Sequence, residues 1–323
     1  MSPEIVLFID ANQYLVLFNA LAGKKLLDAL EEQKAYIFVT TQVVEEVQRN
    51  KIEKAVDLLS QQVEKLNLTQ VGIPDHLFGI SDDKTTAFRR RLNELRDEAT
   101  KIKSDLVQVA KEALSKISRS EDDVSKRLMA LFDKAVSPKP EEVDRARNRK
   151  ERGTPPGKPE QPLGDQINWE QLVSHCKGAK RIWIVTEDTD FCTSFEDVLL
   201  LNPVLHDNLK RADGTFPAVF CFRKLLEGLT HFKENAGVKA EKVPTGRDAE
   251  EIKKALETVN TLREIPPLDG RHFWIIRPNF NLQQWLSSDF DFSSDMPRKN
   301  LGWLFAPNPP SPAGVPPTDT PPS

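Results

Sequence analysis

The sequence predicts an α/β protein with three layers, in which a central parallel sheet lies between two layers of helices. Continuous apolar runs are typical of strands that are covered on both faces. Stretches with helical periodicity separate these runs, and strands that alternate with helices indicate a parallel sheet. The apolar runs of strand length lie at 5–9, 35–39, 181–186 and 217–222.

Composition excludes several classes of protein. The chain has 323 residues, 39% of them hydrophobic, and a net charge of −4, so a surface that binds nucleic acid must be local. Three scattered cysteines (Cys176, Cys192 and Cys221) are too few for a disulfide framework or a zinc cluster, and we expect free thiols. The first four residues lack the basic region of a signal peptide. No apolar run approaches the ~20 residues of a membrane span, so we expect a cytoplasmic protein.

The first part of the chain predicts strand, helix, strand and helix. Residues 13–33 have apolar positions at helical spacing, with a break at Gly23. After the second strand, Thr40 or Thr41 can cap the next helix, which continues through 51–66 with one apolar face.

Residues 84–118 change in character, because apolar residues recur there at alternating four- and three-residue steps. A helix of ~35 residues would be ~50 Å long, too long for an ordinary layer of a compact domain. We interpret about 80–137 as a helical arm or hairpin inserted into the sheet domain, returning through 121–136. The alternative is a helix packed lengthwise across the domain. A heptad-like seam makes a homodimer or a protein partner plausible at the insertion.

Residues 138–163 are rich in proline and glycine and carry a cluster of basic residues, and we expect a long loop there. The alternating pattern then continues with a helix at 165–177, a strand at 181–186, a helix at 191–201, a strand at 217–222 and a helix at 223–235.

The pattern divides the chain into an α/β domain at 1–235, an α+β extension at 236–305 and a tail at 306–323. Proline dominates the tail, which cannot bury a core and is expected to be disordered. Within the extension we expect a helix at 248–263, a strand at 273–276 and a helix near Trp285.

Acidic residues stand where strands end and helices begin. Asp10 ends the first apolar run, Asp188 and Asp190 follow a later one, Glu46 lies on the helix after the second strand, and Asp165 starts a later helix. Ligands of open α/β sheets gather at the carboxyl ends of the strands. Mg²⁺ and Mn²⁺ take oxygen ligands, and a cluster of carboxylates without a cation is costly. Each acid alone could cap a helix or face solvent, but their joint position favours a metal site.

These residues, in this order, resemble the PIN-domain nuclease superfamily. Its members have an Asp ending strand one, a Glu on the helix after strand two, an Asp starting a later helix, and Thr-x-Asp-x-Asp-Phe after a further strand. Asp10, Glu46, Asp165 and the segment Thr186 to Phe191 match this pattern. The resemblance covers roughly 4–235.

The chain looks closest to a bacterial PIN-like group with a long helical insertion. That group shows Gln-Val-x-x-Glu, a Pro-Pro-Gly stretch and then Gly-Asp-x-x-x-Trp. The sequence departs from it at Gln166-Ile167-Asn168, where the group is more usually apolar. The matching segments here are Gln42 to Glu46, residues 80–150 as the insertion, Pro155-Pro156-Gly157, and Gly164 to Trp169.

The resemblance implies a metal-dependent nuclease, most simply an endoribonuclease on single-stranded RNA, with Mg²⁺ or Mn²⁺ to activate water. By the resemblance, the ion's ligands would be Asp10, Glu46, Asp165 and Asp188, with Asp190 as an accessory acid. Glu45 points about 100° away from Glu46 around the helix. Asn12 could hydrogen-bond a phosphate or a metal-bound water, or simply start a helix, and Thr186 could orient Asp188.

Positive side chains must hold a phosphate backbone beside such a cluster. The best candidates are Arg149, Lys150 and Arg152 in the basic loop, ahead of Arg89-Arg90-Arg91 and of Lys177 with Lys180 and Arg181. The alternative is that these charged segments only form surfaces exposed to solvent. Trp169 could stack on a base, but core packing is the favoured interpretation.

Two other classes of function stay open. One is a non-catalytic PIN-like module that binds RNA or a protein. The other is a phosphatase of the haloacid-dehalogenase type, in which the residue two positions after the first Asp is normally an acid. Asn12 occupies that position here, and no lysine is suitably placed.

Overall fold

Four parallel strands form the central sheet of the computed structural model, which describes residues 3–19, 23–66, 83–157, 162–196 and 198–260. The strand order is β2-β1-β3-β6, and β1 pairs along its whole length with β3, from Ile5 opposite Arg181 to Ile9 opposite Val185. The predicted α/β fold with a central parallel sheet is therefore confirmed. The strands are β1 (Ile5–Ile9), β2 (Ile37–Phe38), β3 (Arg181–Val185) and β6 (Ala218–Phe222).

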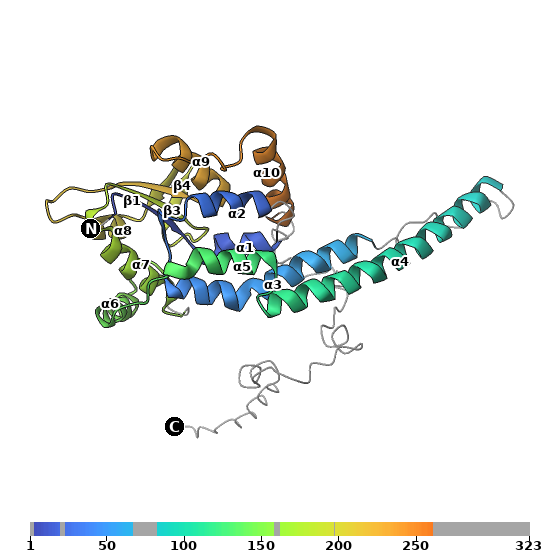
Figure 1. The fold of residues 1–323 in the computed structure, drawn as a ribbon, viewed down its shortest axis with the longest axis horizontal. Coiled ribbons are helices and arrows are strands. Elements are labelled where there is room, and N and C mark those ends of the chain that lie inside the picture. Colours follow the sequence, from blue (N-terminus) through green and yellow to red (C-terminus); the bar gives the residue numbers. More distant parts are fainter. Residues whose placement is uncertain (1–2, 20–22, 67–82, 158–161, 197, 261–323) are drawn as a thin grey trace, which may run out of the picture. The chain divides into compact units, whose positions relative to one another are not determined.

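Helices cover both sides of the sheet, with α2 and α9 on one side of the strands and α6 and α7 on the other (Figure 1). The helices are α1 (Ala11–Asn19), α2 (Gly23–Glu32), α3 (Thr41–Lys65), α4 (Asp83–Ser118), α5 (Asp123–Leu131), α6 (Pro140–Glu151), α7 (Gly164–His175), α8 (Pro203–Asn208), α9 (Leu225–Asn235) and α10 (Gly246–Asn260), with short 3₁₀ turns at Phe132–Lys134 and Cys176–Gly178.

The core centres on β3. Trp183 is fully buried and packs edge-on against Phe232 of α9, with ring centroids 4.9 Å apart. Gly228 allows this approach, because a Cβ at its position would lie 2.6 Å from Cγ2 of Val185. Trp169 is also fully buried, and its indole donates to Oδ1 of Asn208 over 3.1 Å. The preference for core packing over base stacking is therefore confirmed for this tryptophan.

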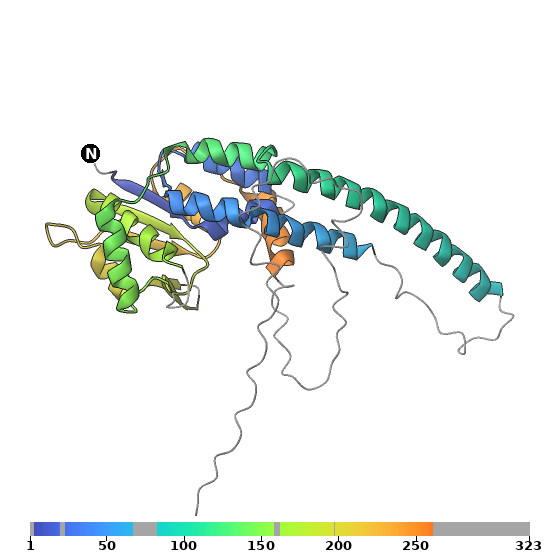
Figure 2. The same cartoon turned by 90° about the horizontal axis from the view of Figure 1, so that it is seen from below.

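The helix predicted at 84–118 is present as α4. Its C-terminal half packs on α3, where Ala110 and Leu114 are buried. Further towards its N-terminus the predicted seam is exposed, with 49% of Leu95 and of Ile102 accessible. Figure 2 shows α3 and α4 extending side by side beyond the sheet, so the arm is a hairpin of these two helices. The return expected through 121–136 is wrong, because α5 in that segment packs on α2.

Two further predicted elements are wrong. The expected loop at 138–163 contains α6, because Pro140 suits the first turn of a helix and Glu142 accepts a 2.9 Å bond from the amide of Lys139. The expected helix at 191–201 is an antiparallel hairpin of β4 (Cys192–Phe195) and β5 (Val198–Leu201). A turn between them is favoured by the left-handed backbone of Glu196, whose φ is 52°.

Within the extension, α10 is the helix predicted at 248–263, displaced by two or three residues. The strand expected at 273–276, the helix near Trp285 and the tail at 306–323 lie outside the described residues. In the part of the chain that is described, no helix combines the length and apolar character needed to cross a membrane.

Candidate functional site

Two acids lie at the carboxyl edge of the sheet because of strand register. Ile9 is paired with Val185, so Asp10 and Thr186 follow neighbouring strands at the same level. The amide of Asp10 donates to the carbonyl of Val185 over 3.0 Å, which holds the two strand ends together. Asp188 lies two residues beyond Thr186 and so belongs to the same edge.

The Asp10 carboxylate is 5% exposed and is held by three donors. Its Oδ1 accepts from the amide of Ala11, and its Oδ2 accepts from Nδ2 of Asn12 and from the hydroxyl of Thr186, each over 2.7 Å. The Thr186 hydroxyl also accepts from the amide of Asp188 over 3.1 Å. Thr186 therefore joins the two acids that follow β1 and β3, which is the contact expected of it from the sequence.

Glu46 reaches the site from α3. The helix is capped by Thr40, whose hydroxyl accepts from the amide of Val43 over 3.1 Å. Glu46 is half-buried whereas its neighbour Glu45 is exposed, as the helical rotation between them predicts.

Asp165 lies in the first turn of α7, close to α3. A Cβ on Gly164 would approach Nε2 of Gln42 to 2.7 Å, so glycine permits the two helices to meet at this point. The hydroxyl of Thr40 donates to Oδ1 of Asn168, which joins the start of α3 to α7. This contact gives the polar side chain at 168 a structural role.

Burial and mutual repulsion raise the pKa values of these acids. Desolvation is the largest cause of a rise in the Asp10 pKa to about 7; the Thr186 hydrogen bond opposes it, and the charges on Asp188, Glu46 and Asp165 add to it. Burial raises the pKa of Asp165 to about 7 as well, again with Asp188 and Glu46 contributing. Four acids from four separate segments therefore act on one another electrostatically.

The remaining acids follow the same pattern. Burial raises the pKa of Glu46, and the charge on Asp188 raises it further, whereas Arg49 lowers it. Asp190 contributes to the raised pKa of Asp165. Asp190 has no such effect on Asp10 or Glu46, so it lies at the margin of the group formed by the other four acids.

The chemistry of this cluster fits a hard divalent ion, because every candidate ligand is a carboxylate oxygen. Its side chains do not have the arrangement of a formed ligand set: in the described ranges, no group of three or more Asp, Glu, His or Cys could hold a metal as placed. Electrostatic coupling acts over longer distances than coordination bonds, so the two observations are compatible.

Arg149, which was expected to contact substrate, is instead part of the fold. Its guanidinium donates to Oε1 of Glu170 over 3.0 and 2.7 Å and to the carbonyl of Pro155, and its side chain is 10% exposed. Arg145 completes the set by binding the other oxygen of Glu170 over 2.7 Å. A guanidinium that neutralises a buried carboxylate is not available to a phosphate backbone.

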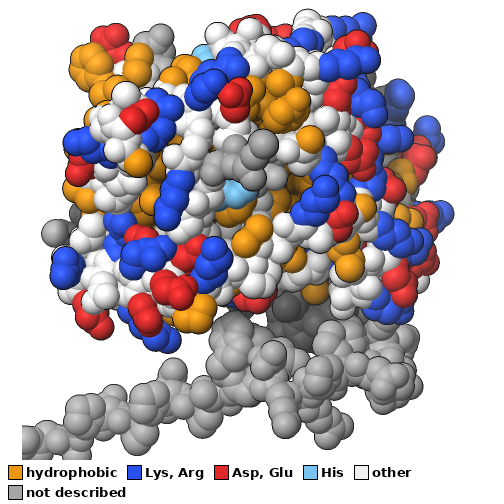
Figure 3. Space-filling model, turned by 60° about the vertical axis from the view of Figure 1, so that its left-hand side comes forward, with side chains coloured by type: hydrophobic (Ala, Val, Ile, Leu, Met, Phe, Trp, Pro, Cys, Tyr) orange, Lys and Arg blue, Asp and Glu red, His pale blue; other side chains and the backbone are white. Residues whose placement is uncertain are grey.

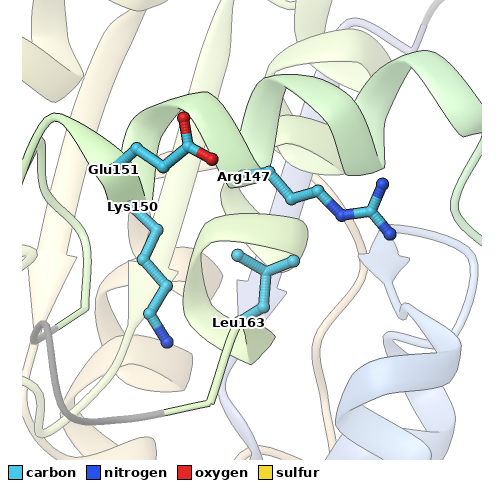
Figure 4. Close-up of a pocket in the computed structure, with 4 residues that line it drawn as sticks. All are labelled: Arg147, Lys150, Glu151 and Leu163. Atoms are coloured by element: carbon cyan, nitrogen blue, oxygen red, sulfur yellow. The ribbon is translucent and has the colours of Figure 1, made fainter.

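Lys150 and Arg152 have different surroundings from Arg149. Arg152 is exposed at the end of α6. Lys150 lines a cavity of about 470 Å³ with Arg147, Glu151 and Leu163 (Figure 4). Leu163 lies directly before α7, two residues from Asp165, so the cavity is near the start of the helix that carries this acid.

Two lysines that no sequence pattern singles out lie beside the acids. Lys54 of α3 and Lys224, which follows β6, line a smaller cavity together with Asn12 and Glu187. The one signal for Lys224 is positional, since it lies just beyond the carboxyl end of a predicted strand. On the face in Figure 3, acidic and basic side chains are interspersed.

The fold agrees with comparison to known families. A PIN-domain family model matches residues 7–191, more than half of the chain, and the chain therefore belongs to the PIN-domain family. PIN domains are generally nucleases, which supports a hydrolase of nucleic acids at this coarse level. No curated protein and no solved structure matches the chain.

Proposed function

We propose that the chain is a metal-dependent endoribonuclease that cuts single-stranded RNA. The observation that carries this proposal is the convergence of acids from β1, α3, α7 and the segment after β3, where burial first and repulsion between the acids second raise the pKa values of Asp10 and Asp165 to about 7. Buried carboxylates that repel one another need a compensating cation to be ionised together at neutral pH.

The residues proposed to hold Mg²⁺ or Mn²⁺ are Asp10, Glu46, Asp165 and Asp188, with Asp190 as an accessory acid. When bound, the ion would lower the pKa of a water and stabilise charge on the phosphate oxygens. Asp10 is fixed for this role by Asn12 and Thr186, which leave its carboxylate little freedom to rotate.

We also propose that the substrate is RNA and that basic side chains near the acids hold it. Support comes from the family and from Lys150 and Arg152, which lie on the segment leading to α7. Asn12 keeps its amide group at the site and is proposed to contact a phosphate or a bound water. A protein partner or a second copy at the exposed seam of α4, and a cytoplasmic location, stay predictions from the sequence.

The same residues bear on two alternative functions. A phosphatase of the haloacid-dehalogenase type would need an acid at position 12, whereas the side chain of Asn12 donates a hydrogen bond to Asp10. A non-catalytic module would have the same fold and would bind RNA or a protein without cleaving nucleic acid.

The test is cleavage of labelled single-stranded RNA and DNA by the full chain with Mg²⁺, Mn²⁺ or EDTA. We expect RNA cleavage that needs the ion and is lost in the Asp10→Asn/Asp188→Asn variant, with circular dichroism confirming that this variant folds. Folded, metal-bound protein that cleaves neither nucleic acid would favour the non-catalytic module. Preference for DNA would retain the nuclease and overturn RNA as the substrate.

A further inference from the structure

A small cavity of about 100 Å³ lies directly beside the acid cluster. Two pairs of neighbouring residues connect the cavity to the cluster. Asn12 lines it and is bonded to Asp10, and Glu187 lines it and precedes Asp188. A ligand in this cavity would therefore lie next to any group that is bound by the acids.

The cavity has an apolar part, lined by Leu15, Val16, Leu225 and Leu256, and a polar part that carries positive charge. Lys54 and Lys224 both line it and are half-buried. Neither lysine has a salt-bridge partner within 4.0 Å in the described part of the chain. Glu187, the one acid in the lining, is exposed and leaves the cavity with a net positive charge.

An amide in the lining points to a polar ligand. Asn19, the last residue of α1, is 6% exposed and lines the cavity. Its side chain has no hydrogen-bond partner among the described residues. The amide atoms of this side chain are not themselves enclosed, so the group is open to the cavity and can bond a ligand oxygen there.

The lining is held in place by hydrogen bonds that extend to the acids. Nε2 of Gln13 donates to Oδ1 of Asn12 over 2.9 Å and to the carbonyl of Arg223 over 3.0 Å. Arg223 in turn donates to the carbonyl of Glu187 over 3.3 Å. The segments after β1, β3 and β6 are thereby connected, so the cavity has a fixed position relative to Asp10 and Asp188.

We propose that this cavity binds a phosphate group of the nucleic-acid strand, next to the one at the acid cluster, with Lys54 and Lys224 as the cations that hold it. This rests on the proposed function for its choice of ligand. Two lysines and an amide suit a phosphate oxygen, and the small volume suits a single phosphate better than a whole nucleotide. The lysines would position the strand, whereas the acids would act at the bond to be cut.

The experiment is binding of a short labelled single-stranded RNA, measured by fluorescence anisotropy over a range of salt concentrations. All proteins are full chains carrying Asp10→Asn so that the RNA stays intact. The Lys54→Ala/Lys224→Ala variant is compared with Lys126→Ala/Lys210→Ala, which removes two exposed lysines that line neither of the two cavities. Asn19→Ala is measured separately to test this amide.

Removing the two cations that hold one phosphate should lower the slope of log K against log salt by about 0.7 and weaken binding about tenfold at moderate salt, because each neutralised phosphate of a single strand contributes about 0.7 to the slope. The control pair should leave the slope unchanged. Equal slopes in the two double variants, or a parent that binds no RNA, would overturn the cavity proposal.

The two proposals fail separately. Cleavage by the wild-type chain, together with unchanged binding in the Lys54→Ala/Lys224→Ala variant, would retain the nuclease and overturn the cavity. RNA binding that needs these lysines, in a chain that never cleaves, would retain the cavity and overturn the nuclease.

Discussion

The hydroxyl of Thr186 donates a 2.7 Å hydrogen bond to Oδ2 of Asp10, and this bond joins the ends of β3 and β1 at the acid cluster. It lowers the pKa of Asp10 against the larger effect of burial. The same hydroxyl accepts from the amide of Asp188. One side chain thus sets both the ionisation of one acid and the position of another.

Thr186→Val should therefore weaken the reaction and move its pH dependence. Loss of a hydrogen bond to a carboxylate raises the pKa of Asp10 further, so ionised Asp10 requires a higher pH. We expect RNA cleavage to fall about tenfold at neutral pH, the equivalent of about one pKa unit, and to recover at higher pH. Thr186→Ser keeps the hydroxyl and should retain the wild-type profile. Identical profiles for the Val and Ser variants would contradict this role.

Stability without metal should fall as the pH rises. The pKa of Asp10 in the folded chain is about 7, above its ordinary value of 3.8, so the folded state binds more protons than the unfolded state in this interval. Its contribution is fully present below the unfolded pKa and is lost as the pH rises through the folded pKa. The loss from this one residue is at most about 4 kcal/mol, since each pKa unit is about 1.4 kcal/mol.

Urea denaturation with a chelator, at about pH 5 and about pH 8, measures this loss. Asp10→Asn should flatten the dependence, because it removes the titrating group. Adding Mn²⁺ at the higher pH should restore stability, since a ligand of the folded state shifts the equilibrium towards it. A wild-type chain that becomes more stable over this interval without metal would contradict the raised pKa.

Arg149→Ala should destabilise the fold without a specific effect on RNA binding. Arg149 and Glu170 have side chains that are 10% and 7% exposed, and removing one partner of a buried ion pair costs about 3 kcal/mol. Arg152→Ala, at the exposed end of α6, is the control and should change the free energy of unfolding by less than about 0.5 kcal/mol. A stable Arg149→Ala variant with weakened RNA binding would contradict this prediction and would support the substrate contact expected from the sequence.

Gly228→Ala should destabilise the contact between α9 and β3. The added Cβ would lie 2.6 Å from Cγ2 of Val185, a stiff and fully buried side chain, so the helix must shift, at a cost of about 2 kcal/mol. Combining it with Val185→Ala removes the clash, and the double variant should be more stable than the sum of the two single effects predicts. Additive effects would show that the clash is relieved elsewhere.

Local patterns were sufficient to predict the sheet and the positions of the acids. The strand that ends at Asp10 and the one that ends before Thr186 are buried on both faces, so their apolar runs are unambiguous. Once these strands are parallel neighbours, their carboxyl ends must meet at one edge. Glu46 could be chosen over Glu45 because helical rotation separates neighbouring side chains.

The other features depend on contacts between distant segments. The partner of Arg149 is Glu170, 21 residues away, and no local pattern reveals it. Lys54 and Lys224 come together only when α3 and the end of β6 pack beside α1. The loop predicted at 138–163 contains a helix instead, because proline interrupts a helix in its interior but is favoured in its first turn, where Pro140 stands.

Binding of Mn²⁺ by isothermal titration calorimetry tests the central claim, that the acids at this edge of the sheet form a divalent-metal site. The wild type is compared with Glu46→Gln and with Glu45→Gln, two neutral replacements at adjacent positions. We expect saturable binding by the wild type and Glu45→Gln, and an affinity about tenfold or more lower for Glu46→Gln, which loses a charged ligand. Equal affinities in all three proteins, or no binding by the folded wild type, would contradict the account.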